Sequence, residues 1–85
     1  MEPRRVVWRE HNLRHITTDH PERRVTREDV EDVLRDSGRR ERPDRRHGTI
    51  VATGRNRDGE ALVVAFLELS DGSAFPVHAR RGHDH

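Results

Sequence analysis

Residues 49–69 read TIVATGRNRDGEALVVAFLEL, and this stretch decides the fold. It holds two β-prone runs, 49–53 and 61–69, which flank a segment where Asp58-Gly59 favours a tight turn. The second run is apolar at nearly every residue as far as Leu67, a pattern typical of a central strand covered on both faces. The stretch therefore predicts a β-hairpin whose second strand lies inside a sheet.

A third strand is predicted after this hairpin. Residues 70–73 (SDGS) favour a turn, and residues 74–79 (AFPVHA) are again β-prone. Pro76 has no backbone N–H to donate, so this strand should lie at a sheet edge or be bulged there. The polar residues 80–85 (RRGHDH) read as a frayed tail. Near the N-terminus, residues 4–8 (RRVVW) predict one further short strand.

The clearest helix signal is VTREDVEDVLRDSG, residues 25–38. Thr26 is a good N-cap, and Asp29 three residues later completes a variant of the capping box. The helix has a stripe of apolar residues on one side, formed by Val30, Val33 and Leu34. Gly38 is a natural stop. These features predict a helix over residues 27–36.

A shorter helix is predicted over residues 10–16, where Leu13 and Ile16 are spaced to face inward together. Pro21 ends any such helix because it supplies no backbone donor and crowds the preceding turn. Residues 39–47 (RRERPDRRH) contain none of Ala, Val, Ile, Leu, Met, Phe or Trp and predict a mobile loop. The chain is expected to form one domain, residues 1–85, in the order β-α-α-β-β-β. This is an α+β fold with two N-terminal helices packed on a small antiparallel sheet.

Composition excludes several classes of protein. The 85 residues include 17 basic and 16 acidic side chains, so net charge gives little indication of nucleic-acid binding. All the basic side chains are arginine, and there is no cysteine to form a disulfide or a thiolate zinc site. No apolar run approaches the roughly 20 residues of a membrane span, and the N-terminus lacks a signal-peptide core. We expect a cytoplasmic protein with no membrane partner.

Three histidines fall within EHNLRHITTDH, residues 10–20. His11 and His15 are four apart and would share one helix face, and His20 follows the helix. They could be solvated on a polar face, or line a site where histidine moves protons near neutral pH. They could also bind a metal, but HEXXH is absent and no spacing matches a strong metal motif. We therefore predict no metal and no cofactor.

Arginines stand at the ends of two predicted strands. Arg55 follows the first strand of the hairpin, and Arg80 and Arg81 close the last strand. In a meander the first and third strands run the same way, so these arginines would lie at one end of the sheet. There they could hold phosphates. The alternative is that they are surface arginines that pair with nearby Asp and Glu. Only 4% of residues are aromatic, which disfavours a base-stacking module.

The chain resembles a known family over nearly all of residues 6–81. Trp8, Glu10, Asn12, His15, Ile16 and His20, followed by VTREDVEDVL, are similar to the N-terminal half of the BrnT-like proteins. TIVATGRNRDGEALVVAFLEL and a strand that ends in Ala-Arg resemble the β-meander of that family. The likeness departs at PERR, which replaces a family glycine, and at Asp19, where the family often has a basic residue.

This resemblance implies a RelE-like fold and a type II toxin, a ribonuclease that uses basic residues without a metal and is held inactive by a cognate antitoxin. By position, it implies His20, Arg55 and Arg80 as catalytic residues. The two arginines would neutralise the scissile phosphate, and His20 would move protons during attack by the RNA 2′-hydroxyl. Further residues expected to contact RNA are His15, Arg57 and Arg81.

The expected partners are RNA and the antitoxin, in a homodimer or a toxin–antitoxin hetero-oligomer. The alternative is a non-catalytic protein of the same fold, which would act as a binding module for a partner chain.

Overall fold

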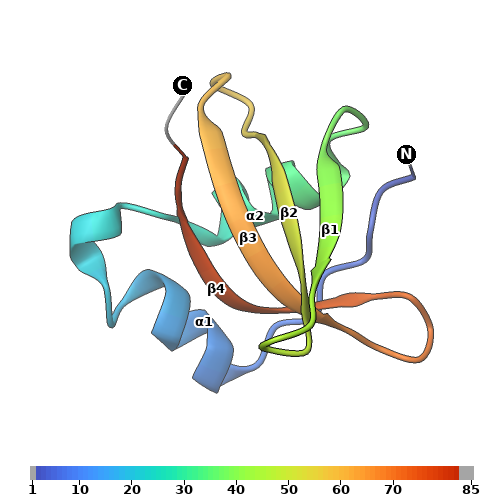
Figure 1. Ribbon diagram of the computed structural model, residues 1–85. Helices are drawn as coiled ribbons and strands as arrows, with labels where there is room; N and C mark the ends of the chain where they lie inside the picture. Colours follow the sequence, from blue (N-terminus) through green and yellow to red (C-terminus); the bar gives the residue numbers. More distant parts are fainter. Residues whose placement is uncertain (1, 83–85) are drawn as a thin grey trace.

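Four antiparallel strands in the order β1-β2-β3-β4 make up the sheet of the computed structural model, which describes residues 2–82 (Figure 1). The strands are β1 (Arg40–Asp44), β2 (Thr49–Arg55), β3 (Ala61–Glu68) and β4 (Ala74–Arg81). They follow α1 (Glu10–Thr17), the short 3₁₀ helix η1 (Pro21–Arg23) and α2 (Arg27–Arg35). The predicted α+β class, with two N-terminal helices packed on a small antiparallel sheet, is confirmed.

The core lies between the helices and one face of the sheet. Helix α2 packs against β2 and β3, and α1 packs against β4. Figure 1 shows α2 behind the sheet and α1 beside β4. The largest fully buried side chains come from β3, β4 and the helices, namely Phe66, Leu62, Val64, Pro76, Ile16, Val30, Val33 and Leu34. The apolar stripe predicted for residues 27–36 is therefore the face that α2 buries.

The start of α2 follows the predicted capping pattern. The backbone N–H of Asp29 donates to the Thr26 hydroxyl at 3.1 Å, and the backbone N–H of Thr26 donates to the Asp29 carboxylate at 3.1 Å. Each bond satisfies a donor that the first helical turn leaves unpaired. The capping box predicted from the sequence is confirmed.

The predicted loop over residues 39–47 is wrong, because Arg40–Asp44 forms the edge strand β1 and pairs with β2. Only the residues that follow β1 make a turn. Arg39, whose side chain is 1% exposed, donates to the Glu41 carboxylate at 2.7 Å and to the Glu2 carbonyl at 2.7 Å. Backbone pairing and buried charge hold this strand in place. Residues 40–44 (RERPD) lack the alternation of apolar and polar side chains that would predict a strand.

The strand predicted over residues 4–8 is also wrong, since only Val6 bridges the sheet, in a single parallel contact with Ala74. The segment divides its backbone hydrogen bonds between two elements. The Val7 N–H donates to the Ala74 carbonyl, whereas the Arg4 N–H donates to the Leu34 carbonyl of α2. The order of elements is therefore α-α-β-β-β-β, not β-α-α-β-β-β.

Strand β3 is central in the sheet, as predicted, but it is covered on one face only. Leu62, Val64 and Phe66 are fully buried beneath the helices. On the opposite face Val63 and Ala65 are half-buried, and Leu67 is 40% exposed. The expectation of cover on both faces fails because the helices pack on one side, which leaves an open sheet face.

The prediction made from Pro76, that its strand lies at a sheet edge or is bulged, is confirmed, and β4 has both features. It is an edge strand, and its register with β3 shifts between Ala65 and Phe66, where Ala65 faces His78 and Phe66 faces Pro76. The strand continues to Arg81, so the predicted polar tail begins inside β4, and its last residues, 83–85, lie outside the described part of the chain. Within residues 2–82, no helix has both the length and the apolar character needed to cross a membrane.

Candidate functional site

Three histidines and an arginine gather where α1 and η1 meet β4. We call His15, His20, Arg23 and His78 the histidine cluster. The rings of His15 and His20 meet edge to face, with their centroids 5.2 Å apart. A guanidinium nitrogen of Arg23 lies 3.3 Å from Nδ1 of His78. Residues from three separate segments thus form one polar centre.

The contact between Arg23 and His78 defines the state of the His78 ring. A guanidinium can only donate hydrogen bonds, so Nδ1 of His78 must accept and carries no hydrogen. Burial lowers the pKa of His78, and the positive charges of Arg23, Arg80, His15 and His20 lower it further. At neutral pH the ring is therefore neutral, and its remaining hydrogen is on Nε2.

His15 and His20 each have a carboxylate beside them. Nδ1 of His15 lies 3.7 Å from the Asp19 carboxylate, and Nδ1 of His20 lies 3.4 Å from the Glu22 carboxylate. Both histidine side chains are partly exposed. A neighbouring carboxylate orients an imidazole, and an oriented, partly exposed imidazole is a group that can transfer protons.

The segment that departs from the BrnT-like pattern contributes directly to this cluster. Pro21 begins η1, a position that suits a residue without a backbone donor. The turn of η1 carries Glu22 toward His20 and Arg23 toward His78. It closes at Arg24, which adopts a left-handed conformation with φ 52°. The PERR segment thus supplies Arg23 to the cluster and places the Glu22 carboxylate beside it.

A groove of about 410 Å³ crosses the open sheet face and reaches the cluster. We call it the open-face groove. Its apolar lining is formed by Val51, Val63, Ala65 and Val77. His78 and Arg80 line it on the β4 side, whereas Arg42 and His47 line it on the β1 side. His78 and Arg80 are two residues apart on β4 and therefore share a sheet face. His78 thus belongs to both the groove and the cluster.

The structure brings only some of the predicted site residues together. His15 and His20 lie in the cluster, and Arg80 lines the groove beside His78. Arg55 lies at the same end of the sheet as Arg80, as predicted, but β3 separates their strands. That spacing is about 10 Å across the sheet. The Arg55 guanidinium donates to the Gly59 carbonyl at 2.8 Å.

Arg57 and Arg81 are held in ion pairs on the surface. Arg57 bonds to the Asp32 carboxylate through its backbone N–H and its side chain, at 3.0–3.2 Å, and lowers the pKa of Asp32. Arg81 bonds to the Glu60 carboxylate at 2.9 Å and to the Arg24 carbonyl at 2.8 Å. Both residues therefore behave as surface arginines that pair with nearby acidic side chains.

Three residues of the resemblance serve the fold. The buried amide of Asn12 donates to the Val7 and Pro76 carbonyls, at 3.3 and 2.9 Å, and its oxygen accepts from the Arg9 N–H. The indole N–H of Trp8 donates to Glu31, and Ile16 is in the core. Two residues of the cluster, Arg23 and His78, were not predicted. His78 could have been predicted from its position two residues before Arg80 in the same strand, because such residues share a sheet face.

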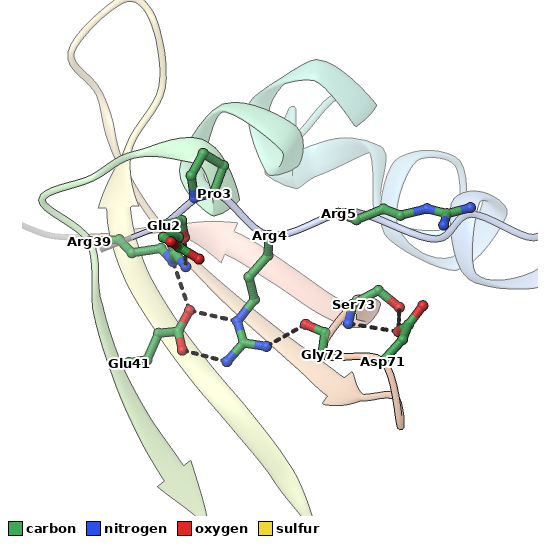
Figure 2. A pocket seen from close by; sticks show the side chains of 9 residues that line it. All are labelled: Glu2, Pro3, Arg4, Arg5, Arg39, Glu41, Asp71, Gly72 and Ser73. Atoms are coloured by element: carbon green, nitrogen blue, oxygen red, sulfur yellow. Dashed lines mark hydrogen bonds and ion pairs between the residues drawn. The ribbon is translucent and has the colours of Figure 1, made fainter.

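A larger hollow, about 780 Å³, lies under the N-terminal segment (Figure 2). Figure 2 shows Arg4 bound to Glu41 by two hydrogen bonds, each 2.9 Å, and to the Gly72 carbonyl at 2.7 Å. Arg39 donates to the same carboxylate. Arg4 and Arg39 thus share the Glu41 carboxylate. Together these side chains form an ion-pair network along the hollow that fastens the N-terminal segment to β1.

Among residues 2–82, no group of three or more histidine, cysteine, aspartate or glutamate side chains is placed to hold a metal ion. Comparison of the chain with known protein families, curated proteins and solved structures found no match. The function is therefore inferred from the arrangement of the histidine cluster and the open-face groove.

Proposed function

We propose that this chain is a metal-independent endoribonuclease that acts in the cytoplasm as the toxin of a type II toxin–antitoxin pair. The observation that carries the proposal is the histidine cluster, in which His15 and His20 meet edge to face beside the Arg23–His78 contact. His78 of the cluster also lines the open-face groove, about 410 Å³ in volume, in which part of an RNA strand would lie. The resemblance to the BrnT-like toxins points to the same chemistry.

The proposed reaction is an internal transesterification. The RNA 2′-oxygen attacks the adjacent phosphorus, the bond from phosphorus to the 5′-oxygen breaks, and the products are a 2′,3′-cyclic phosphate and a 5′-hydroxyl. One of the pair His15 and His20 takes the proton of the 2′-hydroxyl, and the other protonates the departing 5′-oxygen. No metal enters any of these steps.

Charge that develops on the phosphoryl oxygens needs donors at the same place. Arg23, Arg80 and the Nε2–H of His78 supply them in this proposal, since His78 lies within reach of Arg23 and shares the groove with Arg80. Arg55 has no catalytic part in it, because β3 separates its strand from β4. Arg57 and Arg81 have no part in it either, because ion pairs with Asp32 and Glu60 occupy their side chains.

The test is cleavage of RNA by the purified protein in the presence of a chelator. His20→Gln and Arg80→Gln should each lower the rate by about 100-fold, the usual effect of removing a proton-transfer group or a charge-stabilising donor. His11→Gln is the matched control, because His11 is an exposed histidine on α1. Equal rates for wild type, His20→Gln and His11→Gln would refute the proposed mechanism.

A specific observation also favours the second candidate, a non-catalytic binding module. Leu67 and Leu69 are 40% and 37% exposed beside the uncovered face of β3, and such a patch suits contact with a partner chain. The partner would be the antitoxin or a second copy of the chain. A stable complex together with no RNA cleavage at high protein concentration would favour this function over the nuclease.

A further inference from the structure

Strand β1 and the turn after it concentrate positive charge. Arg40, Arg42, Arg45 and Arg46 are all exposed, and we call the segment that carries them, residues 40–47, the arginine hairpin. None of these four side chains makes a hydrogen bond or an ion pair with a described residue. The chain as a whole is nearly neutral, with 17 basic and 16 acidic side chains, so this excess is local.

The two acidic residues of the hairpin offset only part of this charge. Glu41 is bound by Arg4 and Arg39, which lie outside the hairpin. Asp44 accepts from the backbone N–H of Arg46 and lies 2.9 Å from Nδ1 of His47. Both carboxylates are thus engaged, and the four exposed arginines keep their side-chain donors free of any partner among residues 2–82.

The hairpin faces the same side of the sheet as the groove. Arg42 pairs in register with Val51, which lines the groove, and Arg42 itself lines the groove on the side opposite Arg80. Three strand spacings separate β1 from β4, a distance of about 14 Å. A linear polyanion lying in the groove would therefore reach from the histidine cluster to the hairpin.

We propose that the arginine hairpin is a second RNA-binding site, which holds backbone phosphates of a single strand whose scissile linkage lies at the histidine cluster. The identity of this polyanion rests on the proposed function. Arginine binds phosphate in a two-pronged geometry, which suits this role. Pro43 is the one apolar side chain among residues 40–47, so the hairpin lacks the apolar centre that a protein partner would bury.

Binding at such a site is electrostatic and depends steeply on salt. The probe is a short single-stranded RNA made uncleavable by 2′-O-methyl groups, with binding followed by fluorescence anisotropy over a range of salt concentrations. Arg45→Gln combined with Arg46→Gln should reduce the slope of log affinity against log salt by about 1.4, since each phosphate contact contributes roughly 0.7. The matched control is Arg5→Gln combined with Arg35→Gln, two exposed arginines outside the hairpin.

Equal slopes for the two double variants, or no binding by the wild type at low salt, would overturn this inference. If poly-glutamate of the same charge competes as well as RNA, the hairpin binds acidic proteins and the assignment to RNA is wrong. The proposed function is tested separately by cleavage. If the protein binds RNA with the expected slopes but does not cleave it, the hairpin site is supported and the proposed nuclease is wrong. If it cleaves RNA normally but the two double variants have equal slopes, the nuclease is supported and the hairpin site is wrong.

Discussion

At position 78, a half-buried histidine on an edge strand accepts a hydrogen bond from an arginine that comes from a different segment. An imidazole that carries a positive charge loses this bond, because both of its nitrogens then donate. Burial and four nearby positive groups, Arg23, Arg80, His15 and His20, oppose that charge as well. His78 is thus a donor of one defined hydrogen at neutral pH and is unsuited to be a cation.

This state of His78 predicts a dependence of stability on pH. The unfolded chain binds a proton at His78 near the ordinary pKa of 6.5, whereas the folded chain binds it only at lower pH. The free energy of unfolding should therefore fall as pH drops from 6.5 through the lowered pKa of the folded state. Urea denaturation of wild type and His78→Gln tests this. The stability difference between the two proteins should shift against wild type on acidification, and a constant difference would contradict the assignment.

At the scale of elements, the sequence predicted those segments whose signals are local. The hairpin 49–69 and helix α2 carry turn residues, a capping box and apolar periodicity within their own residues. Strand β1 carries none of these, and it forms because β2 offers hydrogen bonds and Arg4 and Arg39 neutralise Glu41. Local patterns cannot indicate a strand that depends on distant partners.

The predicted site divides in the same way. His15 and His20 are five residues apart, and their meeting across one turn could be foreseen from a helix that ends before Pro21. Arg23 and His78 are 55 residues apart, and they meet because η1 packs beside a bulged edge strand. Arg55 and Arg80 share one end of the sheet, as the meander predicted. Strand order alone could not show that Arg23 of η1, and not Arg55, would lie beside His78.

The contacts of β1 lead to a prediction about stability. Glu41→Gln should lower the free energy of unfolding by about 3 kcal/mol, because it leaves the buried guanidinium of Arg39 without the carboxylate beside it. Glu10→Gln is the control, since Glu10 is 88% exposed and its pair with Arg14 should contribute less than about 0.5 kcal/mol. Urea denaturation measures both. Equal losses in the two variants would show that the network does not hold β1 in place.

At the scale of the whole molecule, the two sheet faces have different roles. One face holds the core beneath α1 and α2, and the other holds the open-face groove. The groove has the histidine cluster near its β4 side and the arginine hairpin at its β1 side. A near-neutral chain thus places the arginine hairpin and Arg80 at opposite sides of one groove that also reaches the histidine cluster, an arrangement that suits a phosphate-rich strand.

The most direct test of the proposed nuclease is a DNA oligonucleotide that contains a single ribonucleotide, incubated with the protein in the presence of a chelator. Only a 2′-hydroxyl can serve as the internal nucleophile in the proposed reaction. We predict cleavage on the 3′ side of the ribonucleotide alone, with a 2′,3′-cyclic phosphate on the product, and loss of this cleavage in His20→Gln but not in His11→Gln. An uncut oligonucleotide, or cleavage at deoxyribonucleotides as well, would contradict the assignment of the histidine cluster as the catalytic centre.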